Sequence, residues 1–430
     1  MKTRLHIDLR YMFCFVLVTT ILATASVGAL AQQKLVLFVE PNAQLADFHQ
    51  ELAAEFTKET GIEVEVIVSG GGYPEQVQVY IASGAQIDVT QLWAEGAAPL
   101  MAAGAYRDLT EYIERDPDVS ISDFVPPRVT SFTWHGELLG LPMNANIYLG
   151  LYNRNAVLEA GLQPPDELGD GWDWNRLRGY ARALSRDSNS DGAYDRYGLS
   201  MVPSMMRGGS VIIEQAGAHV FDAYANPTKV TLESDEGLAA VEFLHSLYVE
   251  DGTATWQGPG YWRQGNSALQ LVAAPFDLSF NRDAALSFDW GVMPLPRGPV
   301  HDGTIMLGVG YQITKSSQNP DLAWRLIKFL ATNTENVMRM VNFTGRMPGY
   351  IPALREYETY VVDTFGVPTA RYFAERIISP HNFPGPILPR FGEVTRAFDS
   401  HIRSMINGEI SPRETVTQLG HVLTPLLTVE

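Results

Sequence analysis

Hydrophobic and polar positions follow two different periods in the first part of the chain. Residues 34–39 form a short run that is almost wholly apolar, which is typical of a strand buried on both faces. From Leu45 to Phe56 apolar side chains recur at helical spacing, and Gly61 follows where a helix would end. Residues 62–68 alternate isoleucine or valine with other residues, mostly glutamate, as a strand does. We therefore predict a βαβ unit.

The same alternation of strand and helix patterns continues beyond this unit. We predict a strand over 87–93 and helices over 74–82, 97–103, 153–160, 174–184, 236–248 and 320–331. Asn319 is the expected cap of the last helix, with Pro320 in its first turn. Strands that alternate with helices indicate an α/β fold, and we expect a parallel sheet with helices on both faces.

The first 31 residues differ from the rest of the chain. Basic residues precede an apolar run over 11–22, and Ala29-Leu30-Ala31 has the small-x-small pattern of a signal-peptidase site. We predict a signal peptide over 1–31, with cleavage before Gln32. The alternative is a retained membrane anchor, but the apolar run is shorter than the ~20 residues that span a bilayer. We therefore expect export to the periplasm, with no membrane anchor after cleavage.

Composition narrows the function further. The chain has 430 residues, of which 46% are hydrophobic, so two lobes are expected rather than one compact domain. The net charge of −18 argues against nucleic acid or anionic membranes as partners, because both need clustered Lys and Arg. The only cysteine, Cys14, lies in the predicted signal peptide. We therefore expect no disulfide, no thiol catalysis and no cysteine metal site in the mature chain.

No catalytic motif is present in the sequence. We find no G-x-S-x-G elbow, H-E-x-x-H helix, Walker loop or G-x-G-x-x-G fingerprint, and the 9 histidines are scattered. A glycosidase or lyase would need paired carboxylates, which Glu40, Glu95 and Asp277 could supply. Acidic residues are so plentiful here that this pairing carries little information. We expect a protein that is not an enzyme and requires no cofactor.

Five blocks of sequence resemble a known family in the same order. They are residues 82–89, 104–110, 140–162, 290–296 and 320–330. The blocks are similar to those of the family 1 extracellular solute-binding proteins, the maltose-binding-protein-like group, although Ile87 stands where that family has proline. The resemblance extends over essentially the whole mature chain.

The resemblance implies the type II periplasmic-binding-protein fold, in which a ligand cleft separates two α/β lobes. It places lobe one at 32–142 and 291–342, lobe two at 143–290 and 343–430, and hinge crossovers near 142–148, 290–296 and 343–351. It also implies a periplasmic, monomeric binding subunit of a bacterial ABC importer. In such a protein the ligand stabilises the closed form, which the membrane permease subunits recognise.

A sugar or small oligosaccharide is the ligand that the residue pattern favours. Sugars need aromatic platforms beside amides and carboxylates, and ligands gather at the carboxyl ends of parallel strands. The candidate aromatic residues are Tyr73, Trp93, Tyr148, Trp256, Tyr261, Trp262 and Phe276, and the resemblance of residues 308–311 to a glycine-bearing strand of the family adds Tyr311. The candidate polar residues are Glu40, Glu95, Asn144, Asn146, Asp277, Asn281 and Arg346. For each of them, the alternative is an ordinary core, capping or surface role.

Other functions are compatible with the same sequence. The fold could instead carry a polyamine, a metal-ion complex or a glycerophosphodiester, since net acidity permits cations. A secreted carbohydrate-active enzyme is the alternative from a different functional class. The aromatic content of 10% favours sugars among these cargoes.

One loop has the pattern of a calcium site. Residues 187–195 place oxygen ligands at EF-hand positions, with Gly192 at the turn: Asp187, Asn189, Asp191, the carbonyl of Ala193, and Asp195. Position 12 is Gly198 instead of glutamate, so calcium would bind weakly or take a ligand from elsewhere. The alternative is a plain Asx-rich turn. Calcium bound here would be structural.

Overall fold

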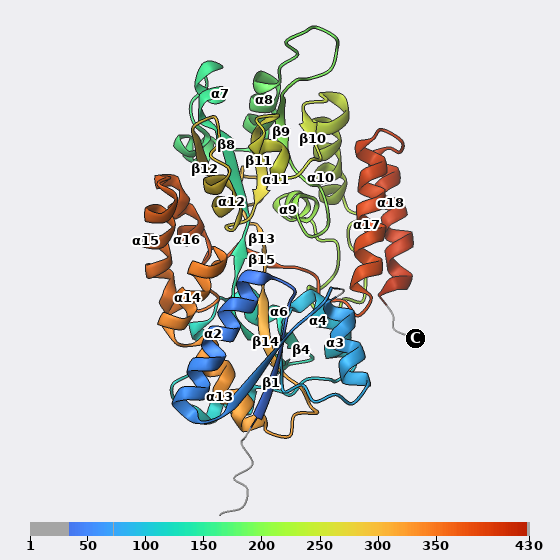
Figure 1. Ribbon diagram of the computed structural model, residues 1–430. Coiled ribbons are helices and arrows are strands. Elements are labelled where there is room, and N and C mark those ends of the chain that lie inside the picture. The colour runs from blue at the N-terminus through green and yellow to red at the C-terminus, as the bar shows by residue number, and fades with distance from the viewer. Residues whose placement is uncertain (1–33, 72, 428–430) are drawn as a thin grey trace, which may run out of the picture.

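Two five-stranded sheets form the centres of two lobes, which lie one above the other in Figure 1. The computed structural model describes residues 34–71 and 73–427. The predicted signal peptide and Cys14 lie outside the described residues. Within the described part of the chain, no helix combines the length and the apolar character needed to span a bilayer.

The sheet of the first lobe has the strand order β2-β1-β3-β14-β6. Its strands are β1 (Lys34–Val39), β2 (Glu63–Val68), β3 (Val89–Trp93), β14 (Val309–Ile313) and β6 (Leu141–Pro142). β1 pairs in parallel with β2 and β3, as the βαβ pattern predicts. β14 is antiparallel to both β3 and β6. The prediction of a parallel sheet is therefore wrong at β14, because this strand enters the sheet from the other lobe.

The sheet of the second lobe has the order β10-β9-β11-β8-β12. Its strands are β8 (Leu149–Asn153), β9 (Tyr197–Ser200), β10 (Ala254–Thr255), β11 (Ser267–Ala273) and β12 (Trp290–Met293). β12 pairs with β8 along its whole length, from Trp290 opposite Asn153 to Met293 opposite Gly150. Residues 291–293 therefore lie in the second sheet, although the expected boundary assigns them to lobe one.

A short three-stranded sheet joins the lobes (Figure 1). It consists of β7 (Asn146–Ile147), β13 (Ile305–Leu307) and β15 (Phe383–Pro384). The crossover expected near 142–148 coincides with β7. The crossover expected near 290–296 is displaced to β13, because β12 is still paired within the second lobe.

Helices cover both sheets. In the first lobe they are α2 (Ala43–Thr60), α3 (Tyr73–Ala82), α4 (Ala94–Ala102), α5 (Thr110–Arg115), α6 (Pro126–Ser131), α13 (Pro320–Ala331) and α14 (Thr334–Thr344), together with the hairpin β4 (Thr133–Trp134) and β5 (Glu137–Leu138). α2 ends at Gly61, whose φ of 73° is left-handed, as predicted. Asn319 occupies the cap position of α13, but in the described structure its side chain makes no capping hydrogen bond.

The remaining helices belong to the second lobe and its flanks. They are α7 (Arg154–Glu159), α8 (Trp174–Leu184), α9 (Gly208–Gln215), α10 (Asp235–His245), α11 (Pro259–Arg263), α12 (Asp277–Asp283), α15 (Leu354–Phe365), α16 (Tyr372–Arg376), α17 (Phe391–Ile406) and α18 (Pro412–Leu423). The helix predicted over 236–248 ends as an α-helix at His245 and continues as a π-helical turn over Ser246–Glu250. In Figure 1, α17 and α18 stand side by side on one flank, beyond α10.

Candidate functional site

A cleft of about 790 Å³ lies between the first lobe and the start of α17. Four residues that the sequence predicts for the site line it together: Glu40 after β1, Trp93 at the end of β3, Glu95 in the first turn of α4, and Arg346 after α14. β1 and β3 are parallel neighbours, so their carboxyl ends meet at one edge of the sheet. The strand pattern therefore predicted the positions of Glu40, Trp93 and Glu95 at this edge, but not that of Arg346.

The indole of Trp93 depends on a glycine one helical turn later. A Cβ atom at Gly96 would lie 2.5 Å from the Trp93 ring. Glycine at this position lets the ring fold against the first turn of α4 while part of it still faces the cleft. An aromatic ring held in this way is a platform on which the C–H face of a sugar or another flat ligand can stack.

Glu40 and Arg346 form an ion pair at the border of the cleft. Arg346 Nη2 lies 2.6 Å from Glu40 Oε1, and the side chains are 17% and 13% exposed. The backbone N–H of Glu40 also donates to Gln91 Oε1 at 3.0 Å. The pair joins the end of β1 to the segment after α14, and it offers a ligand both charged and hydrogen-bonding groups.

Glu95 is paired with a residue that the sequence analysis missed. Arg128 Nη1 lies 3.4 Å from Glu95 Oε1, and the two side chains are 0% and 1% exposed. Burial raises the pKa of Glu95, and the nearby guanidinium of Arg128 opposes that rise. No sequence pattern indicated Arg128, because the two residues are 33 positions apart on different helices.

The opposite wall comes from the start of α17, which the sequence analysis also missed. Arg390, Phe391, Glu393 and Arg396 line the cleft there. Arg390 donates hydrogen bonds to both carboxylate oxygens of Glu393, at 2.9 and 2.5 Å. A signal was available in the Gly- and Pro-rich stretch over 384–389, which precedes Phe391 much as the Gly-Pro-Gly run over 258–260 precedes Tyr261 and Trp262.

Asn144 and Asn146 lie in the hinge and do not line the cleft. Asn144 Oδ1 accepts a hydrogen bond from the backbone N–H of Val309 at 2.6 Å. Asn146 Oδ1 accepts one from the N–H of Met347 at 3.1 Å. Both amides are buried, so they connect the crossing strands to one another.

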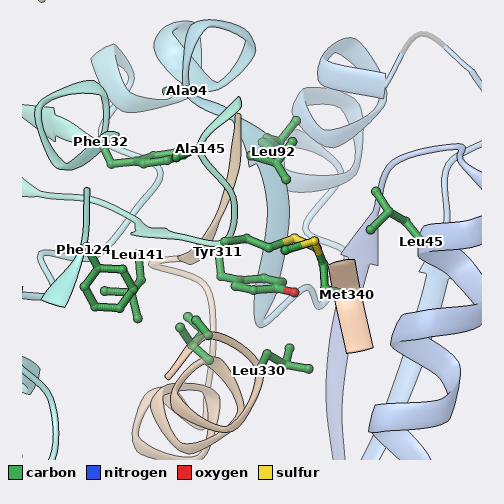
Figure 2. Packing of buried hydrophobic residues seen from close by; sticks show 14 of the residues in the cluster. Leu45, Leu92, Ala94, Phe124, Phe132, Leu141, Ala145, Tyr311, Leu330 and Met340 are labelled. Carbon is green, nitrogen blue, oxygen red and sulfur yellow. The ribbon is translucent and has the colours of Figure 1, made fainter. Parts of the chain in front are cut away.

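Tyr311 and Trp262 do not face the cleft, contrary to the expectation from sequence. Both side chains are 0% exposed. Figure 2 shows Tyr311 among Leu141, Leu330 and Met340 in the core of the first lobe. Trp262 packs against the rings of Phe288 and Trp290. Tyr311 points into the core because it belongs to an interior strand covered on both faces.

Four of the other predicted aromatic residues lie in the second lobe. Tyr148 is buried beneath the guanidinium of Arg207, which lies 4.7 Å from the centre of its ring. Trp256 is 41% exposed and stacks with Arg403 of α17 at 4.3 Å. Phe276 and Tyr261 are partly buried, and Tyr261 lies in α11. The side chain of Tyr73 lies outside the described part of the structure.

The two remaining polar candidates are buried in the second lobe. Asp277 Oδ2 accepts the N–H of Ala274 at 2.8 Å, and burial raises its pKa. Arg263 lies 3.7 Å from its other oxygen. Asn281 is 1% exposed, and neither atom of its amide has a partner among the described residues. These residues do not line the cleft between the first lobe and α17.

His49, the hydrogen-bond partner of Tyr311, should make the stability of the fold depend on pH. His49 is fully buried; its Nε2 lies 2.9 Å from Tyr311 Oη and its Nδ1 lies 2.6 Å from the carbonyl oxygen of Leu45. Burial lowers the pKa of His49 from 6.5 to about 4. Between these values the unfolded chain binds a proton that the folded chain does not. The free energy of unfolding should therefore fall by up to roughly 3 kcal/mol as pH drops from 6.5 to 4, and should not change through His49 above pH 6.5.

Urea titrations at several pH values would measure this dependence. His49→Gln should flatten the slope between pH 4 and 6.5, whereas His421→Gln, which changes an exposed histidine, should keep the wild-type slope. Equal slopes in the wild type and His49→Gln would show that His49 does not stay neutral in the folded chain.

The predicted calcium loop is closed by its own hydrogen bonds. Asp187 Oδ2 accepts the N–H of Gly192 at 3.0 Å, and Asp195 Oδ2 accepts the N–H of Ser188 at 2.5 Å. Among residues 34–71 and 73–427, no three His, Cys, Asp or Glu side chains gather into a group that could hold a metal ion. The expected ligand set also includes Asn189 and the carbonyl of Ala193, and calcium binding stays a prediction.

Comparisons with known proteins agree with this architecture. The family model described as "Bacterial extracellular solute-binding protein" matches residues 42–337. A probable amino-acid ABC transporter periplasmic-binding protein of Sinorhizobium fredii is 24% identical over 324 residues, which cover 71% of this chain and 70% of the relative.

Two solved structures show the same fold. The ABC substrate-binding protein from Listeria monocytogenes in complex with cycloalternan aligns with a TM-score of 0.77 at 19% identity, covering 92% of this chain and 98% of that chain. The sugar-binding protein MalE from Xanthomonas citri aligns with a TM-score of 0.77 at 19% identity, covering 92% of this chain and 97% of that chain.

Proposed function

This chain belongs to the bacterial extracellular solute-binding proteins, and from that premise we propose that its cleft binds a sugar or small oligosaccharide for delivery to the permease of an ABC importer. It is the solute-binding protein of an ABC transporter. The proposal concerns which solute it binds and which residues hold that solute. The observation that carries it is the pairing of aromatic rings with carboxylates in one cleft.

Trp93 and Phe391 supply the aromatic surface from two sides of the cleft. Trp93 belongs to the first lobe and Phe391 to the start of α17, and both line the same cavity. Glu40, Glu95 and Arg346 lie beside them and can exchange hydrogen bonds with hydroxyl groups. A cavity of about 790 Å³ is large enough for more than a single sugar ring.

Binding to both walls would favour the closed form. A ligand that touches only one lobe binds the open and closed forms equally and shifts no equilibrium. A ligand held between Trp93 and Phe391 gains its second set of contacts only on closure. To move the lobes from 1% to 99% closed, those contacts must contribute about 5.5 kcal/mol. No covalent step is needed for this work.

A second candidate cargo is an amino acid. The Sinorhizobium fredii relative carries that description in its name. In addition, the pair Glu40–Arg346 offers one group for an ammonium and one for a carboxylate. The aromatic surface of the cleft favours sugars over this alternative.

Thermal unfolding with a ligand panel distinguishes the two cargoes. The panel contains cycloalternan, maltotetraose and maltose, together with amino acids of each charge class. At a concentration of 100 times Kd, the correct ligand stabilises the folded chain by about 2.7 kcal/mol, so Tm should rise with a sugar and stay constant with the amino acids. Shifts with amino acids alone would contradict the sugar proposal and keep the family assignment. Release of a sugar product during incubation would indicate an enzyme.

We also propose that export removes residues 1–31 and leaves a monomer with no membrane anchor. The support is the sequence pattern of a basic start, an apolar run and Ala29-Leu30-Ala31. This assignment fits a family whose description is extracellular.

A further inference from the structure

One buried cation contacts both the cleft wall and the hinge. Arg128 of α6 is 0% exposed. Its Nη1 lies 3.4 Å from Glu95 Oε1 and donates to the Met306 carbonyl at 3.2 Å. Nη1 also donates to Ser131 Oγ at 3.1 Å, and Nη2 donates to the Gly308 carbonyl at 2.5 Å. The guanidinium is therefore shared between three segments that are far apart in sequence.

These partners have different places in the fold. Glu95 lines the cleft. Met306 belongs to the hinge strand β13, and Gly308 connects β13 to β14 of the first lobe. The segment after β15 packs on the same carboxylate, since a Cβ atom at Gly385 would lie 2.8 Å from Glu95 Oε1. Two segments that cross between the lobes, β13 with Gly308 and the segment after β15, thus contact the Arg128–Glu95 pair beside the cleft.

Stability alone does not explain a charged pair at this position. Burying two charges costs several kcal/mol per ion, and replacing such a pair by apolar side chains of similar size is often neutral or stabilising. The pair is also incompletely satisfied, because Arg128 Nε has no hydrogen-bond partner in the described structure. The planar guanidinium of Arg128, which binds two carbonyls and a carboxylate, holds these groups in a fixed relative position, and an apolar side chain would not.

We propose that Arg128 is a positioning residue, which fixes the first-lobe end of the hinge strand β13 and holds the Glu95 carboxylate in the wall of the cleft. The inference rests on the proposed function, because the position of Glu95 matters only if the cleft binds a solute. Arg128 itself does not line the cleft and so acts through Glu95 and β13. The movement of the lobes and the affinity for the ligand then both depend on Arg128.

Hydrogen exchange of the ligand-free full chain tests the hinge half of this inference. Lysine keeps the charge but not the planar guanidinium, so Arg128→Lys should increase amide exchange over residues 305–309 about tenfold and leave the rest of the first-lobe core near wild type. Arg107→Lys is the matched control. Arg107 donates to the carbonyls of Thr314, Lys315 and Ser317, which lie away from the hinge and the cleft.

Two further variants separate positioning from a general loss of structure. Glu95→Gln keeps the hinge contacts of Arg128 but leaves its charge without a carboxylate, so Tm should fall. Exchange over 305–309 should change no more than in the rest of the first lobe, while affinity for maltotetraose falls at least tenfold. Arg128→Met combined with Glu95→Gln leaves no unpaired charge and should fold with a Tm near wild type, but with fast exchange over 305–309.

Two results would overturn the inference. One is unchanged exchange over 305–309 in both Arg128 variants. The other is faster exchange spread over the whole first lobe, because that would make Arg128 an ordinary core residue. The exchange measurement needs no ligand, so a wild-type chain that binds no sugar would contradict the proposed cargo and still give a result for Arg128.

Discussion

Gly308→Ala is expected to lower the free energy of unfolding by about 3 kcal/mol, because the new methyl group has no space. A Cβ atom at position 308 would lie 2.3 Å from the carbonyl oxygen of Asn144 and 2.8 Å from its Oδ1. The first of these atoms belongs to the backbone, so the clash cannot be relieved by a change of rotamer. The two crossing segments must separate, which breaks the 2.6 Å bond from Val309 N–H to Asn144 Oδ1. Urea unfolding measures the loss.

A second glycine provides the control for this prediction. Gly179 lies inside α8, and a Cβ atom there would meet nothing within 4 Å. Gly179→Ala should stabilise the chain by about 0.5–1 kcal/mol, because alanine lowers the entropy of the unfolded state and favours the helix. If Gly308→Ala were as stable as the wild type, the close contact between the two crossing segments would be contradicted.

Trp93→Ala is expected to weaken sugar binding by ~1–3 kcal/mol, a loss of about 5- to 150-fold in affinity. The ring is partly exposed and lines the cleft, so its removal takes away a stacking surface. Little loss of fold is expected, because the ring lies at the edge of the core of the first lobe. Calorimetric titration with the sugar identified in the panel gives the change in affinity, and thermal unfolding checks the fold.

Trp256→Ala is the matched control for Trp93. Trp256 is 41% exposed, stacks with Arg403 and does not line the cleft. Its removal should leave the affinity for sugar unchanged. An unchanged affinity in Trp93→Ala would exclude Trp93 from the site, whereas equal losses in both variants would indicate an indirect effect through the second lobe.

Local pattern was sufficient for the elements that carry their own signals. The helix predicted over 174–184 is observed as α8 with the same bounds, and α13 begins at Pro320 and ends at Ala331 as predicted. The parallel pair β1–β3 followed from the βαβ alternation, and it brings Glu40 and Trp93 to one edge. These features depend on the spacing of apolar residues and on turn residues within and between successive elements, which a sequence displays directly.

The tertiary structure alone decided how distant segments combine. The β14 strand runs against its neighbours because the chain arrives from the other lobe, and it takes Tyr311 into the core. The pair Arg128–Glu95 and the start of α17 reach the cleft through contacts between segments with no shared pattern. The sequence by itself determined the two-lobed α/β class and one wall of the cleft. The opposite wall and the hinge depend on packing across long sequence separations, which the spacing of residues along the chain does not encode.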